Sequence, residues 1–202
     1  MRSAAVLLDL DGTLVDSRVV IARHWGMFAE RHGLELESIL AVCHGRRSAD
    51  TIAEIAPHLD AASESALLDA GEETDVDGLV TVTGAAELLS RLDPARWAIV
   101  TSGHDVLARR RLEAVGLPVP DVLVTGDAVE RGKPHPEGFL RAAAALGVEA
   151  VACVVVEDAP AGIAAGRAAG ARVVGVTTTH PVDALRGADL IVADLRGLDD
   201  AL

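Results

Sequence analysis

Two aspartates follow the first apolar run of the chain. The run 5–8 (AVLL) is followed by Asp9, Leu10 and Asp11, and then by the turn residues Gly12 and Thr13. A short apolar run of this kind is typical of a buried parallel strand, and such strands present ligand-binding groups at their carboxyl ends. A positioned carboxylate can act as a covalent nucleophile or can carry a proton. The segment 5–13 therefore predicts chemistry at a strand end.

Chemically useful side chains also follow three later apolar runs. The run 97–100 leads into Thr101-Ser102-Gly103, the run 122–125 precedes Gly132-Lys133-Pro134, and the run 151–156 leads into Glu157-Asp158. Each motif alone has a structural explanation as a turn, a helix cap, a solvated loop or an acidic helix N-terminus. Their joint occurrence, each close behind an apolar run, favours one active site.

The charges of these residues predict a cation. Two like charges about 4 Å apart repel by about 4 kcal/mol at an effective dielectric of about 20. Four converging carboxylates therefore require positive charge, and Lys133 supplies one unit of it. A hard divalent ion such as Mg²⁺, which takes carboxylate, phosphate and water oxygens, is expected to supply the rest.

In type and order, these four motifs resemble those of the haloacid dehalogenase superfamily of phosphohydrolases. The matching residues are Asp9-x-Asp11-Gly12-Thr13, Thr101, Lys133 and the pair Glu157-Asp158. The resemblance implies that Asp9 is the nucleophile and that Asp11 is the general acid/base. Asp11 would protonate the leaving alkoxide and then activate the water that cleaves an aspartyl-phosphate.

The resemblance also implies how phosphate and metal are held. Thr101 and the amides of Ser102 and Gly103 would bind phosphate oxygens, and Lys133 would neutralise both phosphate and nucleophile. The expected Mg²⁺ ligands are Asp9, the backbone carbonyl of Asp11, and Asp158 with help from Glu157.

The elements that must position these residues follow from the apolar pattern. Strands alternate with helical segments after residue 80, which indicates an α/β fold with a Rossmann-like parallel sheet. We expect helices at 84–92, 104–115, 136–146 and 160–169, the last packed closely on the sheet through its small residues. The final strands are expected at 173–176 and, towards an edge, at 190–192.

Residues 17–79 interrupt this alternation, because strand signals vanish and apolar residues recur at helical spacing. Examples are Val19, Val20, Ala22, Trp25, Phe28, Ala29, Ile52, Ile55 and Leu59. In the resembled superfamily this position holds the small helical cap of the type-one members. We therefore predict a core of residues 1–16 plus 80–202 and a cap of residues 17–79, with hinges near 16–17 and 77–83.

The cap segment 44–51 contains two adjacent arginines, Arg46 and Arg47, which favour an anionic or hydroxyl-rich ligand. The segment is similar to the HGxR loop of sugar- and glycerol-phosphate phosphatases in the superfamily. The alternative is a solvated helix N-terminus capped by Ser48. The chain has Ile21 where β-phosphoglucomutases have a histidine in the first cap helix, and Ser48 where they have the loop arginine. Haloacid dehalogenases lack the second aspartate of the first motif. This chain has that aspartate as Asp11, which favours phosphate chemistry over carbon–halogen hydrolysis.

Composition limits the partners. The net charge of −13 argues against nucleic acid, which binds through Lys and Arg. No apolar run is long enough for a membrane span, and the start of the chain lacks a signal-peptide layout, so we expect a cytoplasmic protein with no membrane partner. Cys43 and Cys153 are expected to be buried thiols. The expected partner is a small-molecule phosphate ester, bound by a monomer or weak homodimer.

The sequence thus predicts a Mg²⁺-dependent phosphatase that hydrolyses a small phosphorylated sugar or polyol through an aspartyl-phosphate at Asp9. Two alternatives remain open: a phosphosugar mutase of the β-phosphoglucomutase type, and a catalytically idle protein that binds phosphometabolites. We also hypothesise a cis peptide bond between Lys133 and Pro134.

Overall fold

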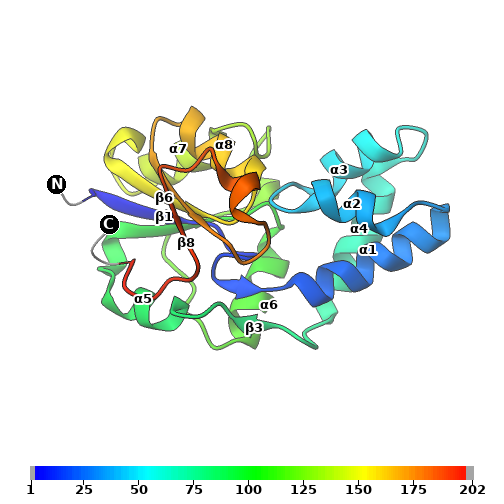
Figure 1. Ribbon diagram of the computed structural model, residues 1–202, viewed down its shortest axis with the longest axis horizontal. Coiled ribbons are helices and arrows are strands. Elements are labelled where there is room, and N and C mark those ends of the chain that lie inside the picture. Colours follow the sequence, from blue (N-terminus) through cyan, green and yellow to red (C-terminus); the bar gives the residue numbers. More distant parts are fainter. Residues whose placement is uncertain (1–2, 199–202) are drawn as a thin grey trace.

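A six-stranded sheet forms the centre of the larger lobe (Figure 1). The computed structural model describes residues 3–198. The strand order is β5-β4-β1-β6-β7-β8, and every neighbouring pair is parallel. The strands are β1 (Ala5–Leu8), β4 (Trp97–Val100), β5 (Leu123–Val124), β6 (Cys153–Glu157), β7 (Arg172–Val176) and β8 (Leu190–Val192). This arrangement confirms the predicted α/β fold, including β8 at one edge.

The register brings the carboxyl ends of the three central strands together. In β1, Leu8 pairs with Ile99 of β4 and with Val156 of β6. The residues that follow these strands therefore meet at one edge of the sheet. This common edge is where ligands bind in open parallel sheets.

Helices cover both faces of the sheet, and the alternation of side chains along β1 explains why. Leu8 belongs to one apolar cluster and Leu7 to the cluster on the opposite face. The covering helices are α5 (Ala85–Arg91) and α6 (Asp105–Ala114) on the first face, and α7 (Glu137–Ala145) and α8 (Pro160–Ala168) on the second (Figure 1). Each lies within the range expected from the sequence.

Short 3₁₀ helices complete this lobe. They are η1 (Pro94–Arg96), η2 (Gly126–Ala128), η3 (Ala150–Ala152) and η4 (Val182–Leu185). The apolar run 151–156 is therefore not strand throughout, because η3 precedes β6 and leaves Val151 exposed. The small residues of α8 do allow close packing: a Cβ atom added to Gly162 would lie 1.6 Å from Glu157 Oε1.

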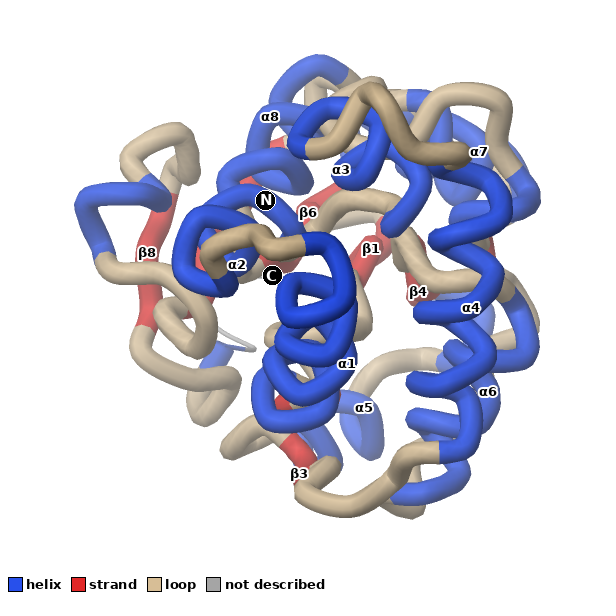
Figure 2. The backbone as a smooth tube through the Cα atoms, turned by 90° about the vertical axis from the view of Figure 1, so that its right-hand side faces the viewer, coloured by secondary structure: helices blue, strands red, loops and turns tan. Residues whose placement is uncertain are grey.

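Four helices form the second lobe, which stands apart from the sheet in Figure 1 and faces the viewer in Figure 2. They are α1 (Arg18–His32), α2 (Leu36–Cys43), α3 (Ser48–Ile55) and α4 (Ala61–Thr74). Their apolar cluster includes Trp25, Phe28, Ile39, Ile52 and Leu68. Val19 departs from the expected pattern, because it is 56% exposed.

The chain enters and leaves the helical lobe through two adjacent strands. β2 (Val15–Asp16) and β3 (Val80–Thr81) pair antiparallel, and the sequence analysis predicted neither. Two residues each are too few for an alternating apolar pattern. The division at residues 16–17 and 79–80 remains our proposal, and the separate apolar cluster of the helical lobe supports it.

The two cysteines and the lengths of the helices were also the subject of predictions from the sequence. Cys43 and Cys153 are buried free thiols, as predicted. Within residues 3–198, no helix combines the length and apolar character that crossing a membrane requires.

Candidate active site

Lys133, the single lysine of the chain, lies at the carboxyl edge of the sheet. Its Nζ donates to Asp9 Oδ1 at 2.6 Å, to Glu157 Oε1 at 2.7 Å and to the carbonyl of Val100 at 2.9 Å. All three charged side chains are buried. The Lys133–Pro134 peptide bond is cis, as hypothesised from the sequence. Lys133 thus joins residues at the carboxyl ends of β1, β4 and β6.

Three carboxylates form a compact cluster around this lysine. One oxygen each from Asp9, Glu157 and Asp158 lies within 4.8 Å of the others. Asp9 Oδ2 and both carboxylate oxygens of Asp158 are buried without a hydrogen-bond donor among residues 3–198. Buried carboxylates are normally paired or bound to a metal. The donor set therefore fits a divalent cation with oxygen ligands.

The pKa values of the cluster depend on burial and on the neighbouring charges. Burial raises the pKa of Asp9 to about 7, against the attraction of Lys133. Burial, followed by the charges of Glu157 and Asp9, raises the pKa of Asp158 well above its ordinary value. Burial alone would lower the pKa of Lys133, but Asp9 and Glu157 raise it. Burial is therefore the main cause of the raised pKa values of Asp9 and Asp158, and Lys133 offsets part of its effect on Asp9.

Glu157 differs from the other two carboxylates because both of its oxygens are occupied. Oε1 accepts from Lys133, and Oε2 accepts from the amides of Asp158 at 2.9 Å and Ala159 at 3.0 Å. These bonds hold the lysine and satisfy amides at the start of α8. The sequence analysis grouped Glu157 with the metal ligands. Glu157 belongs to the three-carboxylate cluster that could hold a metal, and its contacts also orient Lys133.

The carboxylate of Asp11 lies outside the three-carboxylate cluster. Its Oδ1 accepts from Ser17 Oγ at 2.8 Å and lies 2.7 Å from Nη1 of Arg111. The turn after Asp11 requires glycine. Gly12 has a φ of +84°, and a Cβ there would lie 1.9 Å from Asp158 Oδ2.

The turn after β4 forms a second wall of the site. Thr101 is buried, and its Oγ1 accepts from the amide of Gly103 at 3.1 Å. Ser102 Oγ donates to the carbonyl of Gly45 in the helical lobe at 2.9 Å. The Ser102 hydroxyl therefore links the two lobes. All three turn residues line the same cavity as Asp9 and Asp11.

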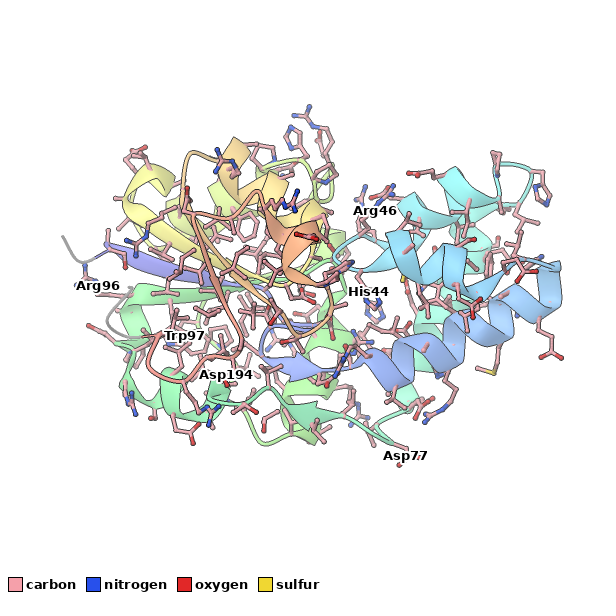
Figure 3. All side chains as sticks on the ribbon, viewed as in Figure 1. His44, Arg46, Asp77, Arg96, Trp97 and Asp194 are labelled. Carbon is pink, nitrogen blue, oxygen red and sulfur yellow. The ribbon has the colours of Figure 1, made fainter. Side chains whose placement is uncertain are left out.

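The helical lobe provides the opposite wall. His44 and Arg46 lie where this lobe faces the sheet lobe (Figure 3). Burial, followed by the charge of His180, lowers the pKa of His44 to about 4, so its ring is neutral at physiological pH. Asp69 and Glu72 of α4 also line the cavity.

The arginines of segment 44–51 have different surroundings. Arg46 lines the cavity and pairs with Glu54 at 2.7 Å. Arg47 forms two hydrogen bonds to Asp50, at 2.6 and 2.9 Å, and also donates to backbone carbonyls of residues 129 and 130. It does not line the cavity with Asp9. These partners occupy the Nε, Nη1 and Nη2 donors of Arg47, which disagrees with the expectation that Arg47 binds an anionic or hydroxyl-rich ligand.

Ser48, the alternative helix cap, is not at the N-cap position of α3, which Arg47 occupies. Helix α3 begins at Ser48 itself, and its Oγ donates to Asp69 Oδ1 at 2.8 Å. The contact joins α3 to α4 at the cavity wall.

Sequence reasoning missed Arg111, Glu72 and Asp69. Arg111 is buried on α6 with Leu107, Ala108 and Leu112. These positions form an apolar stripe at helical spacing, so a charged residue within the stripe was the available signal. Glu72 and Asp69 lie on an acidic helix, and nothing in their spacing separates them from solvated carboxylates.

Comparisons with known proteins agree with this geometry. Residues 4–170 match the family described as haloacid dehalogenase-like hydrolase. Hexitol phosphatase A of Escherichia coli is 42% identical over 96% of this chain and 93% of its own length. Glycerol-1-phosphate phosphohydrolase 2 of Saccharomyces cerevisiae is 37% identical over 93% of this chain and 81% of its own length. The crystal structure of a hydrolase from Pseudomonas syringae matches with a TM-score of 0.88 and 27% identity. The match covers 98% of this chain and 96% of that protein.

The chain therefore belongs to the haloacid dehalogenase-like hydrolases. Within this family it is a phosphoric monoester hydrolase, since phosphatases match nearly its whole length.

Proposed function

We propose that this protein is a Mg²⁺-dependent phosphatase that hydrolyses a small phosphorylated sugar or polyol through an aspartyl-phosphate at Asp9. The observation that carries this proposal is the buried contact of Lys133 with Asp9 and Glu157 beside the buried carboxylate of Asp158. This arrangement holds a nucleophile and a positive charge at one strand edge.

The chemistry assigned to the chain's residues proceeds in two displacements. An oxygen of Asp9 attacks phosphorus, the ester P–O bond breaks, and Asp11 gives its proton to the leaving alkoxide. Asp11 then takes a proton from water, whose oxygen attacks the phosphorus of the aspartyl-phosphate. The P–O bond to Asp9 breaks, and inorganic phosphate leaves. Asp9 Oδ2 accepts no hydrogen bond from residues 3–198, so it is free to form a new bond.

Lys133 and the 101–103 turn would hold the transferred phosphoryl group. Lys133 already contacts Asp9, so its charge lies beside the attacked phosphorus. Asp9 and Asp158, with the backbone carbonyl of Asp11, would hold Mg²⁺, and Glu157 would position Lys133. When bound, the ion would neutralise charge on the phosphoryl oxygens and on the carboxylates.

The leaving-group side of the cavity favours a neutral, hydroxyl-rich substrate. Asp69 presents a carboxylate there, and Glu72 lies beside it on α4. The cationic side chains of this wall are already paired, Arg46 with Glu54 and Arg111 with Asp11 and Glu72. Carboxylates accept hydrogen bonds from hydroxyls and repel a second anion. Relatives named for hexitol and glycerol-1-phosphate hydrolysis have leaving groups of this neutral kind.

The same wall disfavours the mutase alternative. A phosphosugar mutase must accommodate a second phosphate in its bisphosphate intermediate, opposite the transferred one. The Asp69 carboxylate on α4 would oppose that charge. A catalytically idle binder would require a damaged site, whereas Asp9, Asp11, Lys133 and Asp158 are all present.

The helical lobe would act as a cap that excludes water during the reaction.

The proposal is tested by phosphate release from hexitol, glycerol, sugar and glycolate phosphates, with Mg²⁺ and with EDTA. We expect Mg²⁺-dependent release that is fastest for a polyol or sugar phosphate. Asp9→Asn should abolish it, whereas Asp121→Asn, the same change at an exposed position, should not. Acid-quenched wild-type protein should carry hydroxylamine-labile phosphate on Asp9. Isomerised phosphoester product would establish the mutase, and binding without any turnover would establish the idle binder.

A further inference from the structure

Arg111 on α6 connects two carboxylates that come from distant segments. Its Nη1 lies 2.7 Å from Asp11 Oδ1, and its Nη2 donates to Glu72 Oε2 on α4. The side chains of Arg111 and Glu72 are 4% and 6% exposed. A guanidinium presents its donors in a rigid planar fork, so one arginine can fix two carboxylates in defined directions. A lysine ammonium offers no such fork.

The two oxygens of Asp11 have different surroundings. Oδ1 accepts from Ser17 and pairs with Arg111. Within residues 3–198, Oδ2 receives no hydrogen bond, and Asp11 lines the cavity beside Asp9 and Thr101. Two donors on one oxygen hold the carboxylate in a single orientation. The other oxygen is left to carry the proton that an acid/base group exchanges.

The second half of the contact lies between the lobes. Helix α4 packs directly against α6 (Figure 2), and the Glu72–Arg111 pair is buried within that contact. Movement of α4 away from α6 would separate a buried ion pair, which leaves an uncompensated charge on each side. The Glu72–Arg111 pair therefore stabilises the packing of α4 against α6. In that arrangement, Nη1 of Arg111 also contacts Asp11.

We propose that Arg111 is a positioning residue: it holds Oδ1 of Asp11 and, through Glu72, makes that hold depend on α4 packing against α6. The inference rests on the proposed function, because Asp11 must be the acid/base for its orientation to limit turnover. It assigns Arg111 no contact with phosphate. Turnover and phosphate affinity should therefore respond differently to its loss.

The experiment compares wild type with Arg111→Met, Glu72→Leu, the double variant and the control Arg110→Met. Arg110 precedes Arg111 on the same helix, but its side chain is 61% exposed and pairs with Glu113 on that helix. The substrate is the polyol phosphate that the wild type hydrolyses fastest. Inorganic phosphate serves as the competitive inhibitor that reports on the phosphate-binding residues.

We expect Arg111→Met to lower kcat by about 10- to 100-fold while the inhibition constant of phosphate stays within about twofold. Arg110→Met should change neither value. Glu72→Leu should lower kcat by less than Arg111→Met does. The double variant should be no slower than Arg111→Met, because Glu72 acts only through Arg111. Arg111→Lys should recover part of kcat, since one ammonium can still reach one carboxylate.

Three results would overturn the inference. They are a kcat for Arg111→Met equal to that of Arg110→Met, additive losses in the double variant, and a loss of phosphate affinity in proportion to kcat. Circular dichroism and thermal unfolding identify variants that do not fold. If Arg111→Met is one of these, Arg111→Lys and Glu72→Leu give the same non-additivity test. Absence of phosphate release by the wild type would instead refute the proposed function itself.

Discussion

Mg²⁺ should bind this protein more tightly as the pH rises from about 5 to about 7, because the metal must displace protons from the acidic cluster. The perturbation is pH alone, applied to metal-free protein. Burial raises the pKa of Asp9 to about 7, whereas an exposed aspartate has a value of 3.8. The pKa of Asp158 is also raised. Both groups would ligate the ion as carboxylates.

The magnitude follows from the ionised fraction of Asp9. With a pKa of about 7, about 1% of the metal-free protein carries the Asp9 carboxylate at pH 5 and about half carries it at pH 7. The apparent dissociation constant of Mg²⁺ should therefore fall by about 50-fold over this range. Protons bound at Asp158 would make the change steeper.

The same shift sets the direction of stability against pH. The folded, metal-free protein keeps the Asp9 proton up to about pH 7, whereas the unfolded chain releases it near pH 3.8. Stability from this group is therefore complete below about pH 4 and is lost as the pH rises to about 7. Bound Mg²⁺ would neutralise the buried charge that appears when Asp9 loses its proton. Its stabilising effect on Tm should be larger at about pH 8 than at about pH 5.

Calorimetric titration of Mg²⁺ into EDTA-treated protein, in buffers with different ionisation enthalpies, measures both affinity and released protons. Asp9→Asn should release fewer protons and bind Mg²⁺ with a weaker pH dependence. The exposed Asp121→Asn should match the wild type. A dissociation constant that is unchanged between about pH 5 and about pH 7 would refute this account of the cluster.

Three further predictions test the packing and the specificity of the site. Lys133→Met should lower stability at about pH 8 by about 3 to 5 kcal/mol and Tm by about 6 to 20 °C in denaturation scans, because it leaves Asp9 and Glu157 buried without their cation; an unchanged Tm would contradict this. Gly162→Ala should cost about 1 to 3 kcal/mol in urea unfolding, because its Cβ would lie 1.6 Å from Glu157 Oε1. Gly26→Ala in α1, whose Cβ would meet its nearest atom at 3.7 Å, should instead be neutral or stabilising by up to about 1 kcal/mol, and equal losses at the two glycines would be inconsistent with the packing argument. Asp69→Asn should raise kcat/KM for phosphoglycolate relative to a polyol phosphate by about fivefold, because it removes one negative charge from the cavity wall; no change in this ratio would show that Asp69 does not exclude anions.

The sequence predicted the sheet well because its strands are buried on both faces. Such strands appear as uninterrupted apolar runs, so the run 97–100 located β4 and the run 151–156 located most of β6 without knowledge of their neighbours. The two-residue strands β2 and β3 carry no comparable pattern. They form because the chain enters and leaves the helical lobe at the same place, and only the folded chain contains that information.

The conjunction of Asp9, Lys133 and the acidic pair was predictable for a related reason. Asp9 follows β1, the acidic pair lies at the end of β6, and Lys133 lies in the loop after β5, and these parallel strands end at one edge of the sheet. The sequence by itself therefore determined the elements and most of the residues beside the candidate nucleophile. The partners within the site were a different matter. Both oxygens of Glu157 are occupied by Lys133 and by two amides, which no local pattern indicates.

Only the tertiary structure decided which charges pair across the two lobes. Arg46 and Arg47 are adjacent in sequence, yet one lines the cavity and the other is held by Asp50 and backbone carbonyls. Arg111 lies between Asp11 and Glu72, which are distant from it along the chain. The physical reason is that a buried charged side chain must pair with an opposite charge that is buried beside it. Packing of α4 on α6 places Glu72 beside Arg111, and no local sequence pattern indicates that contact.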